Sequence, residues 1–306
     1  MDALKRHADP QAASGTGTGT GTEPGPEPGP LLSVRNLVVE YRAPRRRKPA
    51  LRVLHGIDLD VHPHETVGLV GESGSGKTTL GRAVLGLVPI ASGTIGFAGN
   101  RIDGLTRRAR RALSREIQVV FQDPYGSLNP SMTIGDILTE PLTADRSHNR
   151  VAARARIGEL LDAVGLPGDT ADRPARELSG GQRQRVAIAR ALAPGPRLII
   201  CDEPVSALDL STRAQVLNLL VELQQRTGVA YLFIAHDLSV VGHVSDRVAV
   251  MSRGTIVECD TARRITTEPT HPYTRNLLLA APVPDPDRQA ARRAARHRLV
   301  QDEATR

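Results

Sequence analysis

The sequence predicts an α/β fold in which short buried strands alternate with helices. Residues 66–80 show an apolar strand, a glycine-rich turn and the start of a helix. Two more apolar runs, residues 198–201 and 229–235, end in polar side chains, a pattern typical of strands buried on both faces of a parallel sheet. Between residues 133 and 164 the apolar residues recur every three or four positions, which predicts a separate helical insert.

Composition limits the class of protein. The chain has 306 residues, 40% of them hydrophobic, and a formal charge of +7 that comes almost wholly from arginine. These values suit a soluble globular protein. The positive charge suits contact with phosphates, nucleic acid or an anionic membrane surface without choosing between them, and a codon bias toward arginine explains it equally well. Cys201 and Cys259 lie far apart without metal or redox spacing, so a reducing, cytoplasmic setting is expected.

The N-terminal residues have little to bury. Residues 1–30 combine a Gly-Thr alternation with a Glu-Pro-Gly-Pro repeat, which predicts a disordered leader rather than a folded segment. They lack the apolar stretch of a signal peptide. The whole sequence lacks an apolar run of the roughly 18 to 20 residues that span a bilayer, so any membrane role is expected to depend on a partner.

The strands before the glycine-rich turn are predicted from the alternation of apolar and polar residues. Residues 32–42 alternate well enough to predict a strand, and residues 51–61 predict a second strand pair. Between them, residues 43–50 carry four consecutive cations between prolines, which indicates an exposed loop.

The elements predicted after the glycine-rich turn depend on helix-breaking residues and on charge. A helix over residues 80–87 should stop at Pro89. Residues 92–100 predict a turn and an antiparallel strand, and the arginine-rich residues 107–115 predict a surface helix.

The glycine-rich turn carries specific chemistry. Gly71, Gly76, Lys77 and Thr78 fit the P-loop pattern G-x-x-x-x-G-K-[ST] in the strand-then-helix context that it requires. Glycines let consecutive N–H groups form a nest for an anion, and the helix adds the positive end of its dipole. Lys77 can reach the β- and γ-phosphates, and the Thr78 hydroxyl can ligate Mg²⁺. An ordinary strand–helix connection is the alternative, but the full pattern indicates a nucleoside triphosphate site.

Two adjacent carboxylates end the strand over residues 197–204. Asp202 and Glu203 are placed where parallel sheets bind ligands, at the carboxyl ends of the strands. In a P-loop protein Asp202 would hold Mg²⁺ through water, and Glu203 would orient or deprotonate the attacking water. A structural ion pair is the alternative.

Two more polar residues end neighbouring strands. Gln122 ends a strand over residues 117–122, and His236 follows residues 229–235. Either residue alone would be an ordinary turn or structural residue. Beside the two carboxylates, His236 becomes a candidate γ-phosphate sensor.

A second candidate anion site lies at a predicted helix start. Ser179 is predicted as an N-cap, and Gly180 and Gly181 permit close approach of the backbone. A simple capped helix explains the same residues equally well. Farther on, residues 210–225 predict an amphipathic helix and residues 248–258 a hairpin.

In this order the motifs resemble those of the ATP-binding subunit of an ABC transporter, over residues 31–286. The resemblance is carried by the Walker A loop (71–78), the Q-loop Gln122, the signature L-S-G-G-Q (178–182), the Walker B residues Asp202 and Glu203, the D-loop (206–209) and the switch His236. The segments F-Q-D-P-Y-G-S-L-N-P, T-H-P-Y-T-R and P-V-P-D-P resemble the oligopeptide/dipeptide importer ATPases in particular. The last two suggest the second of the two ATPase subunits that such importers usually pair.

The resemblance implies a fold and its divisions. The fold would be a P-loop NTPase (RecA-like) core with a mixed sheet, an antiparallel β subdomain and a helical insert that bears the signature. The ATP-binding domain would cover residues 31–262, with the insert at about residues 124–190. An oligopeptide-transporter-type extension with a basic tail would cover residues 263–306.

The resemblance also implies ATP and Mg²⁺ as cofactors and a set of site residues. Tyr41 would stack on adenine, and the other ATP-binding residues would be Gly71, Glu72, Ser73, Gly74, Ser75, Gly76, Lys77, Thr78, Thr79 and Gln122. The catalytic residues would be Glu203, His236 and Lys77, and the metal ligands Thr78, Gln122 and Asp202. Because they lie beyond the helical segment 133–164, Ser179, Gly180, Gly181 and Gln182 would close in trans over ATP bound by a partner subunit.

The implied function is ATP hydrolysis that powers import of peptides, nickel or similar small solutes. The partners would be a second ATPase subunit in a homodimer or heterodimer, integral membrane permease subunits and, indirectly, a solute-binding protein. The subunit would lie peripherally at the cytoplasmic face of the cell membrane, and nucleic acid is not an expected partner.

Two rival functions come from the same superfamily. Soluble ABC ATPases that act on ribosomes usually carry two motif sets in one chain, and this chain has one. DNA-repair and chromosome ATPases insert a very long coiled coil between Walker A and the signature. Here that interval is about a hundred residues without sustained heptads.

Overall fold

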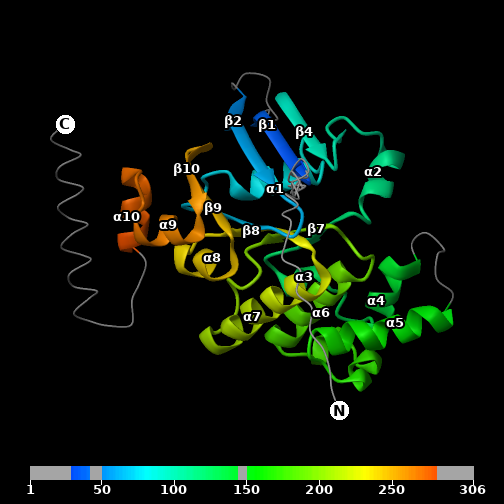
Figure 1. Ribbon diagram of the computed structural model, residues 1–306. Coiled ribbons are helices and arrows are strands. Elements are labelled where there is room, and N and C mark those ends of the chain that lie inside the picture. The colour runs from blue at the N-terminus through cyan, green and yellow to red at the C-terminus, as the bar shows by residue number, and fades with distance from the viewer. Residues whose placement is uncertain (1–28, 42–49, 144–149, 281–306) are drawn as a thin grey trace, which may run out of the picture.

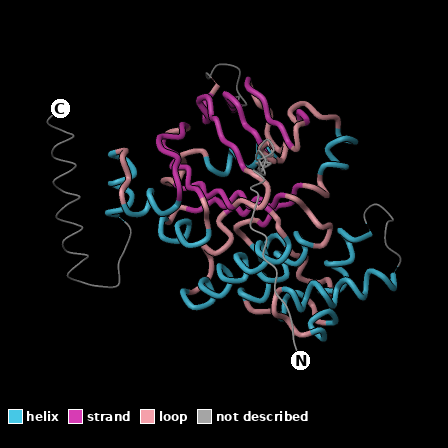
Figure 2. Tube along the Cα trace, viewed as in Figure 1, coloured by secondary structure: helices cyan, strands magenta, loops and turns pink. Residues whose placement is uncertain are grey.

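The structure is a computed structural model that describes residues 29–41, 50–143 and 150–280. The predicted leader up to residue 28, most of the cationic loop 43–50 and the basic tail lie outside the described residues. Within the described part, two β-sheets form the upper half of the molecule and most of the helices the lower half (Figures 1 and 2).

The smaller sheet is antiparallel and has the strand order β2-β1-β4-β5. Its strands are β1 (Leu32–Tyr41), β2 (Leu51–Val61), β4 (Ser92–Phe97) and β5 (Asn100–Arg101). The strand pair predicted over residues 51–61 is wrong, because these residues form the single strand β2, which pairs with β1. The register slips between Ile57 and His55, where Gly56 has φ 84°, a conformation that glycine adopts without steric cost.

The larger sheet is mixed and has the strand order β10-β9-β3-β8-β7-β6. Its strands are β3 (Thr66–Val70), β6 (Ile117–Val120), β7 (Leu198–Asp202), β8 (Ala230–Ala235), β9 (Arg247–Ser252) and β10 (Thr255–Thr261). Neighbouring strands run parallel except β10, which forms the predicted hairpin with β9. Every residue of β3 and β8 is buried. This confirms the prediction that the continuous apolar runs form strands buried on both faces.

Two helices lie on the side of the large sheet that faces the small sheet. Helix α1 (Lys77–Val84) packs in the core between the two sheets, whereas α2 (Arg107–Leu113) lies at the surface. Helix α1 follows the glycine-rich turn, and α2 has no buried residue, as expected of a surface helix. The predicted stop at Pro89 is wrong. Helix α1 ends earlier, because Gly86 has φ 68° and the N–H of Leu87 donates back to the carbonyl of Arg82, a glycine-terminated helix end.

The remaining helices lie on the other face of the large sheet or, in the case of α9 (Ala262–Thr267) and α10 (Pro272–Ala280), beside its β9–β10 end (Figure 1). They are α3 (Pro124–Ser127), α4 (Ile134–Thr143), α5 (Arg150–Ala163), α6 (Gly180–Leu192), α7 (Leu210–Thr227), α8 (Leu238–Val244), α9 and α10. Short 3-10 turns at Gly168–Asp172 and Ala175–Glu177 precede α6. In the described ranges, no helix combines the length and apolar character needed to cross a bilayer.

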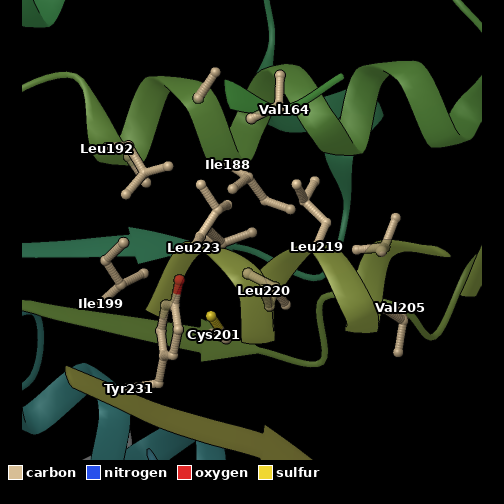
Figure 3. Close-up of a cluster of buried hydrophobic side chains, with 14 of the residues drawn as sticks. Val164, Ile188, Leu192, Ile199, Cys201, Val205, Leu219, Leu220, Leu223 and Tyr231 are labelled. Atoms are coloured by element: carbon tan, nitrogen blue, oxygen red, sulfur yellow. The ribbon is translucent and has the colours of Figure 1, made fainter. Parts of the chain in front are cut away.

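The large sheet separates two hydrophobic cores. Ile199 and Cys201 of β7 belong to the core under the helices (Figure 3), whereas Leu198 and Ile200 belong to the core shared with α1 and the small sheet. This division follows from the alternation of side chains along a strand. The two cores therefore fix the register of the central strands and, with it, where each strand ends.

Candidate functional site

The glycine-rich turn, the first turn of α1 and two polar strand ends line one open pocket of about 350 Å³. The lining residues are Val53, Ser73, Gly74, Gly76, Lys77, Thr78, Thr79, Gln122 and Glu203. All but Val53 are among the residues expected from the sequence. Val53 lies on β2, and only the packing of the small sheet against the turn brings it there.

Two glycines shape the loop for steric reasons. A Cβ on Gly71 would lie 2.0 Å from the carbonyl oxygen of Met251, so the loop starts in direct contact with β9. Gly76 has φ 106° and is the residue before α1. A side chain would be strained in that conformation, so the sharp entry to the helix requires glycine.

Lys77 is almost fully buried at the start of α1, with 5% of its surface exposed. Its Nζ donates hydrogen bonds to the carbonyl oxygens of Gly71 at 2.8 Å and Glu72 at 2.9 Å. Burial lowers the pKa of this ammonium, and the nearby carboxylates of Glu203, Asp202 and Glu72 oppose that shift. A bound polyphosphate would add strong negative charge beside a cation that water solvates poorly.

The pocket residue Thr78 contacts Asp202, the last residue of β7. The Thr78 hydroxyl donates to Oδ1 of Asp202 at 2.9 Å. Burial raises the pKa of Asp202 and the Glu203 charge adds to that shift, while the Thr78 hydrogen bond, Arg82 and Lys77 oppose it. A hydroxyl and a carboxylate suit Mg²⁺, which takes oxygen ligands and usually one or two carboxylates from a protein. This donor set therefore fits a Mg²⁺ ion bound together with phosphates, and the described residues contain no cluster of three or more His, Cys, Asp or Glu that could form an all-protein site.

Glu203 lies where three strand ends converge. Its carboxylate Oε2 accepts from Nε2 of Gln122 at 3.0 Å and lies 3.4 Å from Nδ1 of His236. These residues follow β6, β7 and β8, which are adjacent in the sheet. Glu203 has φ 50°, a conformation that costs a side-chain-bearing residue on the order of 1 kcal/mol. The hydrogen bond from its N–H to the Ile234 carbonyl at 2.9 Å holds it in this position.

The signature residues lie apart from this pocket. Ser179 caps α6, since its hydroxyl accepts from the N–H of Gln182 at 3.3 Å and its own N–H donates to Oε1 of Gln182 at 3.0 Å. A Cβ on Gly181 would lie 2.4 Å from Cγ2 of Thr212 on α7. Gly181 is thus needed for packing inside this chain, a requirement that the sequence alone did not reveal.

Tyr41 ends β1 with 37% of its surface exposed and does not line the pocket. It pairs with Leu51, two positions before the pocket residue Val53. Its expected stacking on adenine stays a prediction, as do the metal contact expected of Gln122 and the in trans contacts of the signature residues.

The fold and the pocket together define a P-loop nucleoside triphosphatase. Residues 54–206 match the family model of ABC transporters, and residues 257–304 match that of the oligopeptide/dipeptide transporter C-terminal region. The chain therefore belongs to the ABC transporter family, with the C-terminal region of its oligopeptide/dipeptide branch. The domain limits at residues 262 and 263 stay predictions.

The chain is similar in sequence to proteins named as import ATP-binding proteins. The chain is 51% identical over 270 residues to the glutathione import ATP-binding protein GsiA of Escherichia coli strain K12, covering 86% of this chain and 43% of that protein. It thus spans less than half the length of GsiA. It is 49% identical over 267 residues to a putative peptide import ATP-binding protein of Brucella ovis, covering 87% of this chain and 83% of that protein.

Solved structures share the architecture. The structure of cbiO1 from Clostridium perfringens, part of the ABC transporter complex cbiONQ, gives a TM-score of 0.69 at 28% identity, and the match covers 78% of this chain and 91% of that chain. A dimeric bacterial ABC transporter cassette, MJ0796, gives a TM-score of 0.68 at 27% identity and covers 76% of this chain and 99% of that chain. The predicted α/β class with its mixed sheet, antiparallel sheet and helical part is confirmed.

Proposed function

We propose that this chain is the ATP-hydrolysing subunit of an importer that moves peptides or similar small solutes through partner permease subunits. The observation that carries the proposal is the single pocket in which the glycine-rich loop, Lys77, Thr78, Gln122 and Glu203 meet. The match of residues 257–304 to the oligopeptide/dipeptide transporter region supports the class of solute.

The residues around the pocket divide the chemistry between them. Backbone N–H groups of the loop and the Lys77 ammonium would bind the phosphates. Thr78 and Asp202, joined by their 2.9 Å hydrogen bond, would hold Mg²⁺ with Gln122. The ion would neutralise charge on the β- and γ-phosphates.

Glu203 would act as the general base on the attacking water, and His236 would contact the γ-phosphate from the other side of that carboxylate. Gln122 donates to Glu203 in the structure. When ATP binds, the Gln122 side chain would leave Glu203 and contact the metal instead. The position of Gln122 would therefore depend on whether nucleotide is bound.

The signature residues need a second cassette. Ser179, Gly180, Gly181 and Gln182 do not line the pocket of their own chain, so they would close over ATP held by a partner, either a second copy or a different ATPase subunit. Two ATP molecules would then join two subunits, and hydrolysis would remove the γ-phosphate contacts. Such a switch requires ATP to bind the closed state far more tightly than the open one.

An apolar groove beside Gln122 suits the permease. The groove has a volume of about 300 Å³ and is lined by Leu87, Leu113 and Phe121 among others. Leu87 is 61% exposed and Phe121 is 39% exposed. Because Phe121 directly precedes Gln122, an apolar segment of a permease seated there would respond to the nucleotide. The subunit would then lie at the cytoplasmic face of the membrane, with a solute-binding protein acting through the permease and with no role for nucleic acid.

Copurification tests the proposal. The tagged full chain, taken from detergent-solubilised membranes of its own cells, should retain integral membrane subunits, and Leu87→Asp should lose them. Recovery with ribosomes or nucleic acid instead would contradict the importer function and favour the rival ABC ATPases.

ATP-dependent pairing provides a second test. In sedimentation experiments Glu203→Gln should form a dimer only when ATP is present. If the cassette pair is a heterodimer, the partner ATPase is included in the sample. Adding Ser179→Ala to Glu203→Gln should weaken this dimer. Thr106→Ala is the matched control, because Thr106 also caps a helix with its hydroxyl but lies outside the pocket. Full turnover by a lone monomer without the Ser179 hydroxyl would refute the two-subunit mechanism.

A further inference from the structure

The C-terminal helix α10 contacts the glycine-rich loop directly. The hydroxyl of Tyr273 accepts a hydrogen bond from the backbone N–H of Glu72 at 3.1 Å, across 201 positions of sequence. Helices α9 and α10 lie beside β9 and β10 (Figure 1), and Tyr273 is half-buried against the core beneath the sheet. Neither the glycine pattern nor the T-H-P-Y-T-R segment indicates this contact.

The contact acts on one peptide group. The N–H of Glu72 and the carbonyl of Gly71 belong to the same planar unit, so the orientation of one fixes the other. That carbonyl accepts from Nζ of Lys77 at 2.8 Å. Tyr273 and Lys77 therefore hold opposite edges of one peptide at the start of the phosphate loop. A peptide next to glycine rotates easily because glycine has little steric restriction, so this unit benefits from being held on both sides.

A carboxylate fixes the segment that delivers Tyr273. Glu258 on β10 accepts from the N–H and hydroxyl of Thr270 at 2.6 and 2.7 Å, and from the N–H of His271 at 3.2 Å. Nδ1 of His271 in turn accepts from the N–H of Tyr273 at 3.1 Å, at the start of α10. This chain of contacts runs from the large sheet to the phosphate loop without using a residue of the pocket.

We propose that Tyr273 is a positioning residue for nucleotide binding, through which the C-terminal region sets the affinity of the phosphate loop. This inference rests on the proposed function. With the hydroxyl present, the Gly71–Glu72 peptide keeps its carbonyl on Lys77 and the loop stays in one conformation before ATP arrives. Without it, the peptide samples more orientations, and binding must first restrict them. By linkage, bound nucleotide should also restrain α10.

The test compares two tyrosine-to-phenylalanine variants of the full chain. Tyr273→Phe removes the hydroxyl and keeps the ring. Tyr231→Phe is the matched control, since its hydroxyl is buried among apolar side chains (Figure 3) and has no hydrogen-bond partner within the described residues. The dissociation constant of the non-hydrolysable analogue AMP-PNP with Mg²⁺ is measured by calorimetry. We expect it to rise roughly 2- to 10-fold in Tyr273→Phe, the range of one neutral hydrogen bond, and to stay unchanged in Tyr231→Phe.

Two further measurements separate positioning from general structure. Melting temperatures without nucleotide should be close to wild type in Tyr273→Phe, and AMP-PNP should slow amide hydrogen exchange over residues 273–280 in wild type more than in the variant. Wild-type affinity in Tyr273→Phe, or equal losses in both variants, would overturn the inference alone. A wild-type chain that does not bind the analogue would overturn the proposed function and this inference with it.

Discussion

The hydroxyl of Thr78 donates a hydrogen bond to Oδ1 of Asp202 at 2.9 Å, although 124 positions separate the two residues. Thr78 lies in the first turn of α1, and Asp202 ends β7. Their contact joins a hydroxyl and a carboxylate, the oxygen donors that the proposed Mg²⁺ site would use. Burial disfavours the charged form of the Asp202 carboxylate. The charge on Asp202 should therefore have a measurable effect on the stability of the folded protein.

Asp202→Asn should stabilise the nucleotide-free protein at neutral pH. Burial raises the pKa of Asp202 above its ordinary value of 3.8, so the folded state disfavours the charged form. Folding therefore carries the full penalty above that raised pKa, and the penalty shrinks below it until it is gone near the ordinary value. The melting temperature of Asp202→Asn should exceed that of wild type at pH 7–8, and the gap should narrow toward acid pH.

Asp209→Asn is the control for this titration. Hydrogen bonds from Thr212 and Ser211 at the start of α7 lower the pKa of Asp209, so its charge favours folding at neutral pH and this variant should not gain stability. A lower melting temperature for Asp202→Asn at pH 7–8 would contradict the burial argument. Its binding of Mg²⁺-ATP should weaken in either case.

Lys77→Ala should abolish ATP binding. The ammonium is buried beside the glycine-rich loop and is held by backbone carbonyls, so its loss removes the cation that the phosphates would contact while leaving the glycines of the loop in place. Calorimetry with ATP and Mg²⁺ measures the effect. Arg108→Ala removes a positive charge from α2, outside the pocket, and should bind normally. An unchanged affinity in Lys77→Ala would count against the phosphate nest.

Glu203→Gln should bind ATP yet hydrolyse it on the order of 10² to 10⁴ times more slowly, the usual contribution of a general base. The amide can keep its contact with Gln122, so the change removes the proton acceptor more than the local structure. Steady-state phosphate release measures turnover. Glu159→Gln, in an exposed ion pair on α5, serves as the control. Wild-type turnover in Glu203→Gln would refute the role of this carboxylate.

Gly181→Ala should destabilise the helical part by about 1–3 kcal/mol, the usual cost of overpacking. The added Cβ would lie 2.4 Å from Cγ2 of Thr212 and 3.7 Å from its Cβ. Removing that methyl group in the double variant Gly181→Ala/Thr212→Ser should restore most of the stability in urea denaturation. Equal losses in the single and double variants would show that packing against α7 is not the reason for the glycine.

Residues fixed by local chemistry were predictable from the sequence. Lys77 and Thr78 follow from the glycine pattern, and Asp202, Glu203 and His236 follow from the rule that parallel strands present their ends at one edge. The structure brings Glu203 next to His236 and Gln122, as that rule requires. The start of α6 at Ser179 was readable for the same reason, since an N-cap depends on a few consecutive residues.

Contacts between distant segments were not predictable. Nothing local distinguishes Val53 from other strand residues, and Tyr273 reaches the phosphate loop only because β10, α9 and α10 fold back beside it. The role of Gly181 depends on Thr212 from another helix. The misplaced end of α1 has a simpler cause. Gly86 comes before Pro89 in the chain, and its left-handed backbone terminates the helix first.

The alternation of β7 between two cores has a consequence for how this protein can change over time. Deleting one residue between Leu198 and Cys201 would exchange the sides of every later side chain in the strand, and both cores would be disrupted together with the position of Asp202. The length of β7 is thus tied to the position of Asp202 beside Thr78, and viable variation should be concentrated in substitutions and surface loops rather than in insertions within the sheet.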